Sequence, residues 1–454
     1  MQSKIKLGEF LFWITGVFST TPILEIYVRG KSVTLFSVTF FATLILLWAR
    51  NKCFFNTPIL AKPVRYFSLW MTTGIAASCV GWLYFNGNEV WQSAATAYLP
   101  KMILYIVFAI LWEQGASEKE SRFLMKGLLF GAILNCVWAT LDGLCFYVAG
   151  FSLNNDVFSS YIQRHGIRFG QLSLVLANGM LRAAGFNMDP ANIGFLGPVV
   201  IAYGLHKRHY GMAVVGFLSL LFSASTTAAV VVLAIFVLEW RNLIPRRKKS
   251  GETQIWMYLL IVLGFAAGTV IVIRVLPLVA RAVGMFAERI NGAYIHTEGA
   301  SPRTVYYLGF LKALLTEGPL VFTGSGFGTS SFPYIKNAEL FRELKPYIDN
   351  APYDPEMTYI AYLFDCGILG LALYIYCLFL LYRYYKENLY TFGYAAECYY
   401  MLLSTAFSAL FYHYILFAPQ ILLIVAGLVE IGRNQKRTCK IIPASKTDNM
   451  TVLK

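Results

Sequence analysis

Residues 358–382 read TYIAYLFDCGILGLALYIYCLFLLY, an apolar run that contains a single charged residue, Asp365. A bilayer core of roughly 30 Å requires about 20 apolar residues in a helix, and this run is long enough. Lipid offers no partners to backbone N–H and C=O groups, so a segment of this composition is expected to be helical. The stretch predicts an all-α protein that is solvated by a membrane.

Apolar runs recur along the chain, whose 454 residues are 57% hydrophobic and 14% charged. A mean hydropathy of +0.57 argues against an ordinary soluble globular protein. The seventh and eighth runs are short and meet at residues 223–227, as a tight hairpin or a re-entrant pair. We predict about twelve transmembrane helices, at residues 8–28, 33–49, 66–86, 97–113, 123–149, 190–205, 210–224, 226–240, 255–275, 358–382, 393–412 and 416–431.

The distribution of Lys and Arg predicts the orientation of these helices. With a cytoplasmic N-terminus, most basic residues between spans fall on the cytoplasmic side, at residues 50–65, 119–122, 207–208, 241–249 and 383–386. This pattern follows the positive-inside rule, and it puts the C-terminus in the cytoplasm with a basic tail at residues 432–454. The net charge of +14 therefore does not require a nucleic-acid partner.

Two connections on the outer side, residues 150–189 and 276–357, are too long to be simple turns. We treat residues 1–454 as one integral membrane domain to which both loops belong. The loops mix Gly, Pro, aromatic and charged residues, which is typical of functional loops. All eight cysteines lie elsewhere, and the chain has no Cys-x-x-Cys or His-rich spacing. The sequence therefore predicts neither a disulfide framework nor a metal site.

Both outer loops carry arginines on the side where the charge bias runs against them. A guanidinium group binds phosphate through paired hydrogen bonds, and a nearby low-dielectric membrane strengthens them. The arginines indicate an anionic substrate, and lipid headgroups or acidic residues of the loops are the alternative partners for each one. They are Arg164, Arg168 and Arg182 in the first loop, and Arg281, Arg289, Arg303 and Arg342 in the second.

A short amphipathic helix is predicted after Arg303, because aromatic and leucine side chains recur at helical spacing over residues 306–314. We expect it to end at Gly318-Pro319 and a glycine turn to follow at residues 324–328 (GSGFG). The turn lacks the Lys-Ser/Thr of a nucleotide-binding loop, which favours a structural role over phosphate binding.

Two segments are similar to a known family. The first contains, in order, Arg303, residues 317–320 (EGPL), the glycine turn, residues 355–360 (PEMTYI) and residues 365–371 (DCGILGL). The second is residues 182–192 (RAAGFNMDPAN), which is similar to an Arg-x-x-Gly-x-Phe-x-(Asn/Asp)-Pro-Asn pattern with one extra residue before the last Asn. In this order the segments resemble the O-antigen polymerase and ligase family.

Two positions depart from the family pattern. Residues 225–227 (STT) stand where members often carry Ser-Arg-Gly, so an arginine is missing there and Arg168 is a candidate substitute. Glu356-Met357 stands where ligases of the family tend to have His-Asn or His-Ser, which favours a polymerase over a ligase.

The resemblance implies a metal-independent glycosyltransferase without a cofactor in the bacterial inner membrane. It would join undecaprenyl-diphosphate-linked oligosaccharide units into O-antigen or a related capsule or exopolysaccharide at the periplasmic face, with a chain-length regulator as a further partner. Arg182, Arg168 and Arg303 would bind the diphosphate, Arg303 with a catalytic role, and Glu356 would be the general base. The alternatives are a ligase that transfers the glycan to lipid A-core, and a flippase or other transporter of lipid-linked oligosaccharides.

Charged residues inside predicted spans are costly in hydrocarbon and are candidates for function. Asp365 is expected to anchor a loop or pack helices, and Lys101 and Asp142 are expected to pair with one another or contact substrate. The outer-loop histidines, His165 and His296, are interpreted as hydrogen-bonded surface residues rather than bases.

Overall fold

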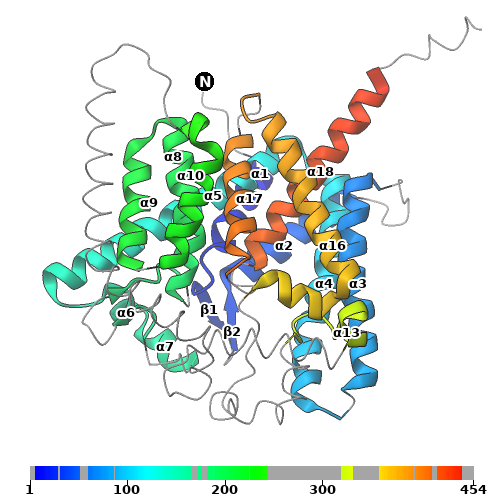
Figure 1. Ribbon diagram of the computed structural model, residues 1–454, viewed down its shortest axis with the longest axis horizontal. Helices are drawn as coiled ribbons and strands as arrows, with labels where there is room; N and C mark the ends of the chain where they lie inside the picture. The colour runs from blue at the N-terminus through cyan, green and yellow to red at the C-terminus, as the bar shows by residue number, and fades with distance from the viewer. Residues whose placement is uncertain are drawn as a thin grey trace, which may run out of the picture.

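The computed structural model describes residues 6–28, 31–51, 60–85, 87–165, 171–175, 181–187, 189–223, 225–243, 318–330, 357–391, 394–411 and 417–441. Within these ranges the chain is mostly helical, with two short two-stranded sheets, as Figure 1 shows. The predicted helical class is confirmed at this level.

A helix lies in every predicted span except residues 255–275, which fall outside the described residues. The helices are α1 (Leu7–Ser19), α2 (Leu35–Arg50), α3 (Lys62–Tyr84), α4 (Glu89–Gly115), α5 (Glu118–Leu144), α8 (Ile193–Lys207), α9 (Tyr210–Ser223), α10 (Thr226–Leu243), α16 (Thr358–Glu387), α17 (Ala395–Ser408) and α18 (Phe417–Ile441).

Among the described residues, 3 helices are long and apolar enough to cross a membrane: Trp91–Gly115, Glu118–Ala149 and Thr358–Glu387. The second includes a π-helical turn, Cys145–Ala149, that extends α5. Shorter apolar helices are Leu7–Ser19, Leu35–Arg50, Ile193–Lys207, Tyr210–Ser223 and Ala228–Trp240. These lengths and compositions are those of a membrane protein.

The first predicted span, residues 8–28, is wrong at its C-terminal end. α1 stops at Ser19, and the chain turns into β1 (Glu25–Val28), which pairs antiparallel with β2 (Lys31–Thr34). The Ser19 and Thr20 hydroxyls donate to carbonyls of the last helical turn, and Pro22 has no N–H with which to continue the helix. A hydropathy pattern alone does not detect this stop.

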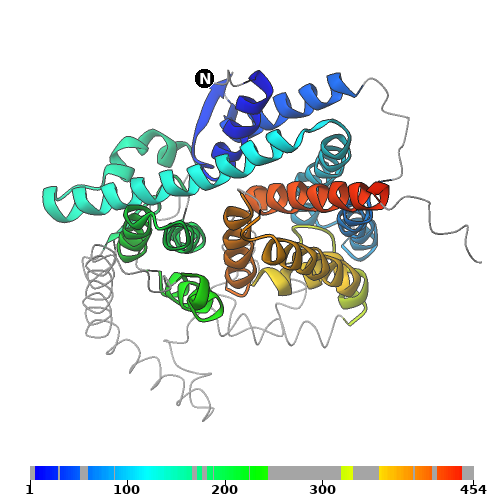
Figure 2. The same cartoon turned by 90° about the horizontal axis from the view of Figure 1, so that it is seen from above.

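α5 is the central helix of the arrangement. Figure 2 shows it running across the molecule, with α1 and α2 on one side and α8, α17 and α18 on the other. The backbones of α5 and α1 approach each other closely, since a Cβ built on Gly127 would lie 2.0 Å from the Trp13 carbonyl oxygen. Small residues that allow such close approach are typical of helix contacts in membranes.

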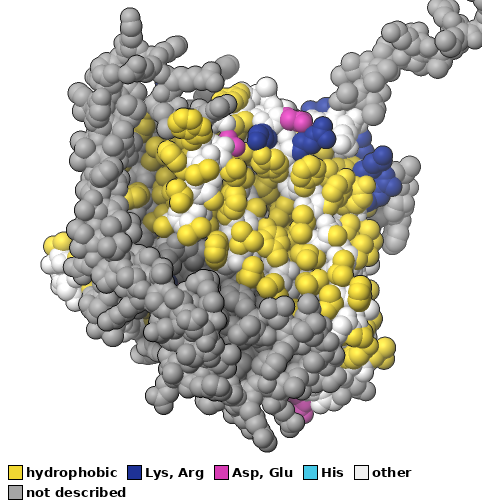
Figure 3. Space-filling view, viewed as in Figure 1, with side chains coloured by type: hydrophobic (Ala, Val, Ile, Leu, Met, Phe, Trp, Pro, Cys, Tyr) yellow, Lys and Arg dark blue, Asp and Glu magenta, His cyan; other side chains and the backbone are white. Residues whose placement is uncertain are grey.

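Basic side chains gather at one end of the helical layer. Where α2, α4, α5 and α18 meet, Arg50 pairs with Glu120 at 2.7 Å and Lys436 pairs with Glu113 at 2.8 Å. Figure 3 shows a band of hydrophobic side chains with Lys and Arg gathered at its upper edge. We call this edge the basic end. We call the opposite end, which carries β1, β2 and the short helices at the bottom of Figure 1, the loop end.

Candidate functional site

Arg182 is the predicted site residue that the structure describes. Arg168, Arg303 and Glu356 lie outside the described residues, as do His296 and residues 303–317, where the amphipathic helix is predicted. The site can therefore be built around Arg182 and around the glycine turn at residues 324–328.

Residues 150–189, predicted as a long loop, contain ordered elements at the loop end. They are α6 (Leu153–Val157), α7 (Ser159–His165), β3 (Leu174–Val175) and β4 (Leu181–Arg182), and a 3-10 turn, Pro190–Asn192, then leads into α8. β3 and β4 pair antiparallel, so Arg182 is carried by a strand rather than by an irregular loop.

A buried asparagine of α5 supports the segment that follows Arg182. Asn135, 0% exposed, donates from Nδ2 to the Thr20 carbonyl at 2.9 Å and to that of Gly131 at 2.9 Å. Its Oδ1 accepts from the Phe186 backbone N–H at 2.9 Å and from Asn187 Nδ2 at 2.8 Å. A single side chain thus joins the end of α1 to the Arg182 segment, and each bond satisfies a group that burial would otherwise penalise.

Asp142, at the end of α5, begins a second buried network. Its Oδ1 accepts from Ser152 Oγ at 2.9 Å and from the Asn154 backbone N–H at 3.0 Å. Asn154 Nδ2 donates to Ser173 Oγ at 3.1 Å, and that oxygen also accepts the Ala184 N–H at 3.1 Å. The network fixes α6 and β3 against the Arg182 strand.

This network corrects the predicted pairing of Asp142 with Lys101. Asp142 is satisfied on one oxygen by Ser152 and Asn154, whereas the Lys101 ammonium lies 4.6 Å from the centroid of the Tyr98 ring. The prediction failed because it considered only charged residues in spans, and local hydroxyl and backbone groups stabilise a buried carboxylate as well.

Arg182 itself lies half-buried beside the turn between α9 and α10. Its Nε donates to the Ser223 carbonyl at 3.4 Å, and the next residue, Ala183, donates its N–H to the Phe222 carbonyl at 2.9 Å. The Arg182 Nη atoms form no hydrogen bond or ion pair with another residue that the structure describes. The guanidinium is therefore placed against the C-terminal end of α9.

The glycine turn at residues 324–328 is held by an acid of the same chain. Asp365 accepts the Gly328 N–H at Oδ2 (2.9 Å) and the Thr329 N–H at Oδ1 (3.1 Å), while Trp91 Nε1 donates to the Ser325 carbonyl at 3.1 Å. Gly328 has φ +78 and Gly367, opposite the turn in α16, has φ +68, both values that favour glycine. The predicted structural role of the turn and the predicted anchoring role of Asp365 are confirmed.

The predicted helix end at Gly318-Pro319 is wrong. Both residues begin a short helix, α13 (Gly318–Thr323), at the loop end. Proline is compatible with the first turn of a helix, where its missing N–H would have no helical partner.

His165, the last residue of α7, is hydrogen-bonded as predicted, and its partner is an acid. Its Nε2 lies 3.0 Å from Glu25 Oε2 and 3.2 Å from Glu25 Oε1, and Arg164 Nη2 lies 3.4 Å from Glu25 Oε1. Burial first, then the Glu25 charge, raises the pKa of the neighbouring Tyr161 to about 12. Sequence reasoning missed Glu25, because β1 and α7 are 140 residues apart and only the fold brings them together.

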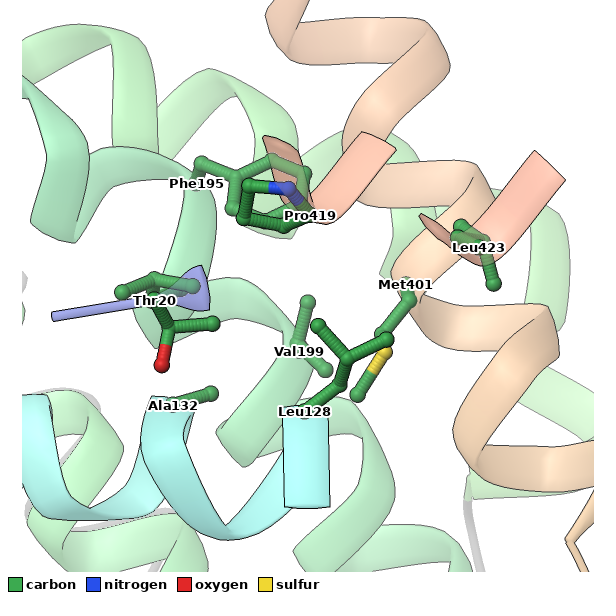
Figure 4. Close-up of a pocket in the computed structure, with 9 residues that line it drawn as sticks. Thr20, Leu128, Ala132, Phe195, Val199, Met401, Pro419 and Leu423 are labelled. Carbon is green, nitrogen blue, oxygen red and sulfur yellow. The ribbon is translucent and has the colours of Figure 1, made fainter. Parts of the chain in front are cut away.

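A small pocket lies deeper, among α1, α5, α8, α17 and α18. Figure 4 shows it lined by carbon-rich side chains, with the Thr20 hydroxyl as the polar exception. No lining residue is charged, so this pocket is not suited to a diphosphate. Its lining is Thr20, Leu128, Ala132, Phe195, Leu196, Val199, Met401, Pro419 and Leu423.

Within the described residues, no group of three or more His, Cys, Asp and Glu side chains could hold a metal ion, and Cys79, Cys136, Cys145, Cys366, Cys377 and Cys398 are free thiols. No family model matches the chain, and no curated protein is similar enough to count as a match.

Proposed function

We propose that the protein polymerises undecaprenyl-diphosphate-linked oligosaccharide units into a surface polysaccharide at the periplasmic face of the bacterial inner membrane. The observation that carries the proposal is Arg182: a half-buried guanidinium on a strand that two buried polar networks hold beside the α9–α10 turn. The sequence around it is similar to the O-antigen polymerase and ligase family.

In this reaction a sugar hydroxyl of one unit attacks the anomeric carbon of another, and the lipid diphosphate leaves. Charge builds up on the departing diphosphate, so a fixed guanidinium nearby stabilises the transition state. Half-burial favours this role, because the interaction between charges is stronger in a lower dielectric. Arg182 would meet the diphosphate through its Nη atoms, together with Arg168 and Arg303, and Glu356 is the base that the sequence predicts.

The membrane arrangement belongs to the same proposal. We propose about twelve spans, with the basic end in the cytoplasm and the loop end in the periplasm, because Lys and Arg are retained on the cytoplasmic side. The chain termini then face the cytoplasm, and Arg182 faces the compartment in which lipid-linked units are joined. A chain-length regulator would be a partner at that face.

The test is the glycan ladder of a strain that lacks the protein, complemented with wild type, Arg182→Ala or Arg182→Lys. Deletion should leave single repeats on the lipid anchor, and Arg182→Ala should lower the polymerisation rate by about 100-fold. Arg182→Lys should restore only part of the ladder, because an ammonium keeps the charge but not the paired hydrogen bonds.

Arg383→Ala is the matched control, because Arg383 is exposed and its ion-pair partner among the described residues is Glu387 of its own helix. It should give a normal ladder, and the membrane abundance of every variant should be measured in parallel. Long chains that remain unattached in the deletion strain would indicate a ligase instead, and an unchanged ladder would rule out both enzymes.

A further inference from the structure

The segment before β1 packs against α7 and against the residues that follow Arg182. Ile23, just before β1, is buried in one cluster with Tyr161 and Ile162 of α7 and with Leu172 and Phe186. Phe186 follows Arg182 by four residues on the segment that Asn135 supports. The cluster therefore fixes α7 and β1 relative to the strand that carries the proposed diphosphate ligand.

On the solvent side of this cluster, Glu25 and His165 form a carboxylate–imidazole pair. The Glu25 side chain is 5% exposed and the His165 side chain is 30% exposed. Nε2 of His165 lies within 3.2 Å of both carboxylate oxygens. In the tautomer that donates Nε2–H to Glu25, Nδ1 keeps its lone pair.

Arg164, Tyr27 and Tyr161 surround the pair. Arg164 faces Glu25 at 3.4 Å and lies over the Tyr27 ring, 5.1 Å from its centroid. The Tyr161 ring lies against the imidazole, with centroids 4.3 Å apart, and a pKa raised to about 12 keeps its phenol uncharged. Arg164 thus gives Glu25 a permanent positive partner in addition to His165.

We propose that His165, oriented by Glu25, is the general base that accepts the proton of the acceptor sugar hydroxyl. The inference rests on the proposed function and assigns the base to His165 instead of Glu356, although the sequence alone favours a surface role for His165. The hydroxyl oxygen forms a bond to the anomeric carbon as the bond from that carbon to the diphosphate oxygen breaks. The diphosphate leaves with the electron pair, and the hydroxyl proton passes to Nδ1 of His165 and then to water.

The experiment measures the initial rate of polymerisation by the purified full-length protein in lipid nanodiscs, with lipid-linked repeat units as substrate, between pH 5.5 and 9. His165→Gln should lower the rate by at least about 100-fold. Added imidazole should restore part of the activity of His165→Gly. Glu25→Gln should lower kcat by less than His165→Gln does and leave KM unchanged, because Glu25 orients the imidazole without contacting the acceptor sugar.

His209→Gln is the matched control, since His209 is exposed at the other end of α8 and should leave rate and pH profile unchanged. A wild-type rate for His165→Gln, or a Glu25→Gln variant that loses as much kcat as His165→Gln, would overturn the assignment while the wild-type protein still polymerises. A wild-type protein that forms no polymer would instead overturn the proposed function and this inference together. Loss of activity in Glu356→Gln with a normal His165→Gln would assign the base to Glu356.

Discussion

Replacing Asp365 by Ala is expected to release the glycine turn from α16. The carboxylate accepts two backbone N–H groups, those of Gly328 and Thr329, at 2.9 and 3.1 Å. Its side chain is 0% exposed and Thr329 is also buried, so water does not replace the lost acceptor. A hydrogen bond to a charged group contributes about 1.5–3 kcal/mol, and two such bonds give a loss of about 3–6 kcal/mol in the free energy of unfolding.

The assay is thermal unfolding of the detergent-solubilised protein, followed by intrinsic tryptophan fluorescence because Trp91 contacts the same turn. Asp365→Ala should lower the midpoint by at least about 5 °C. Asp365→Asn should have a smaller effect, since the amide oxygen still accepts one N–H. Glu387→Ala, which removes an exposed acid of the same helix, serves as the control. A midpoint for Asp365→Ala equal to that of the control would refute the anchoring role.

Further substitutions test the packing and electrostatics of the loop end. Asn135→Ala should destabilise the protein by about 2–4 kcal/mol, because the Phe186 N–H loses its partner in a buried site; an unfolding midpoint equal to that of wild type would contradict this. Gly127→Leu should prevent normal packing of α1 on α5, since even a Cβ there would lie 2.0 Å from the Trp13 carbonyl oxygen, and lowered membrane abundance is the measurement. Tyr161→Phe should leave the pH–rate profile unchanged between pH 6 and 10, because a pKa raised to about 12 keeps the phenol protonated below that pH; a new limb in this range would show that the phenol titrates earlier.

The positions of the helices could be predicted from the sequence because lipid forces apolar segments into helices of a fixed minimum length. α16 and α4 illustrate this, and both begin and end near the predicted limits or extend beyond them. The end of α1 could not be predicted in the same way. Thr20, Thr21 and Pro22 are apolar enough to extend a hydropathy window, although their side chains and backbone stop the helix.

The elements inside residues 150–189 depend on contacts that are distant in sequence. β3 and β4 are held by Asn154 and Ser173, which are in turn held by Asp142 of α5. No local pattern encodes such a network. Asp365 could be recognised as an anchor because it stands directly before a glycine motif in the sequence. Glu25 has no such local signal, and only the fold brings it to His165.

The most direct test of the proposed function is polymerisation by the purified protein alone, supplied with undecaprenyl-diphosphate-linked repeat units. The products should be lipid-linked chains of many repeats in wild type, with Arg383→Ala equal to wild type and Arg182→Ala reduced by about 100-fold. Substrate that stays at single-repeat length with wild-type protein, or an Arg182→Ala variant that elongates at the wild-type rate, would contradict the account.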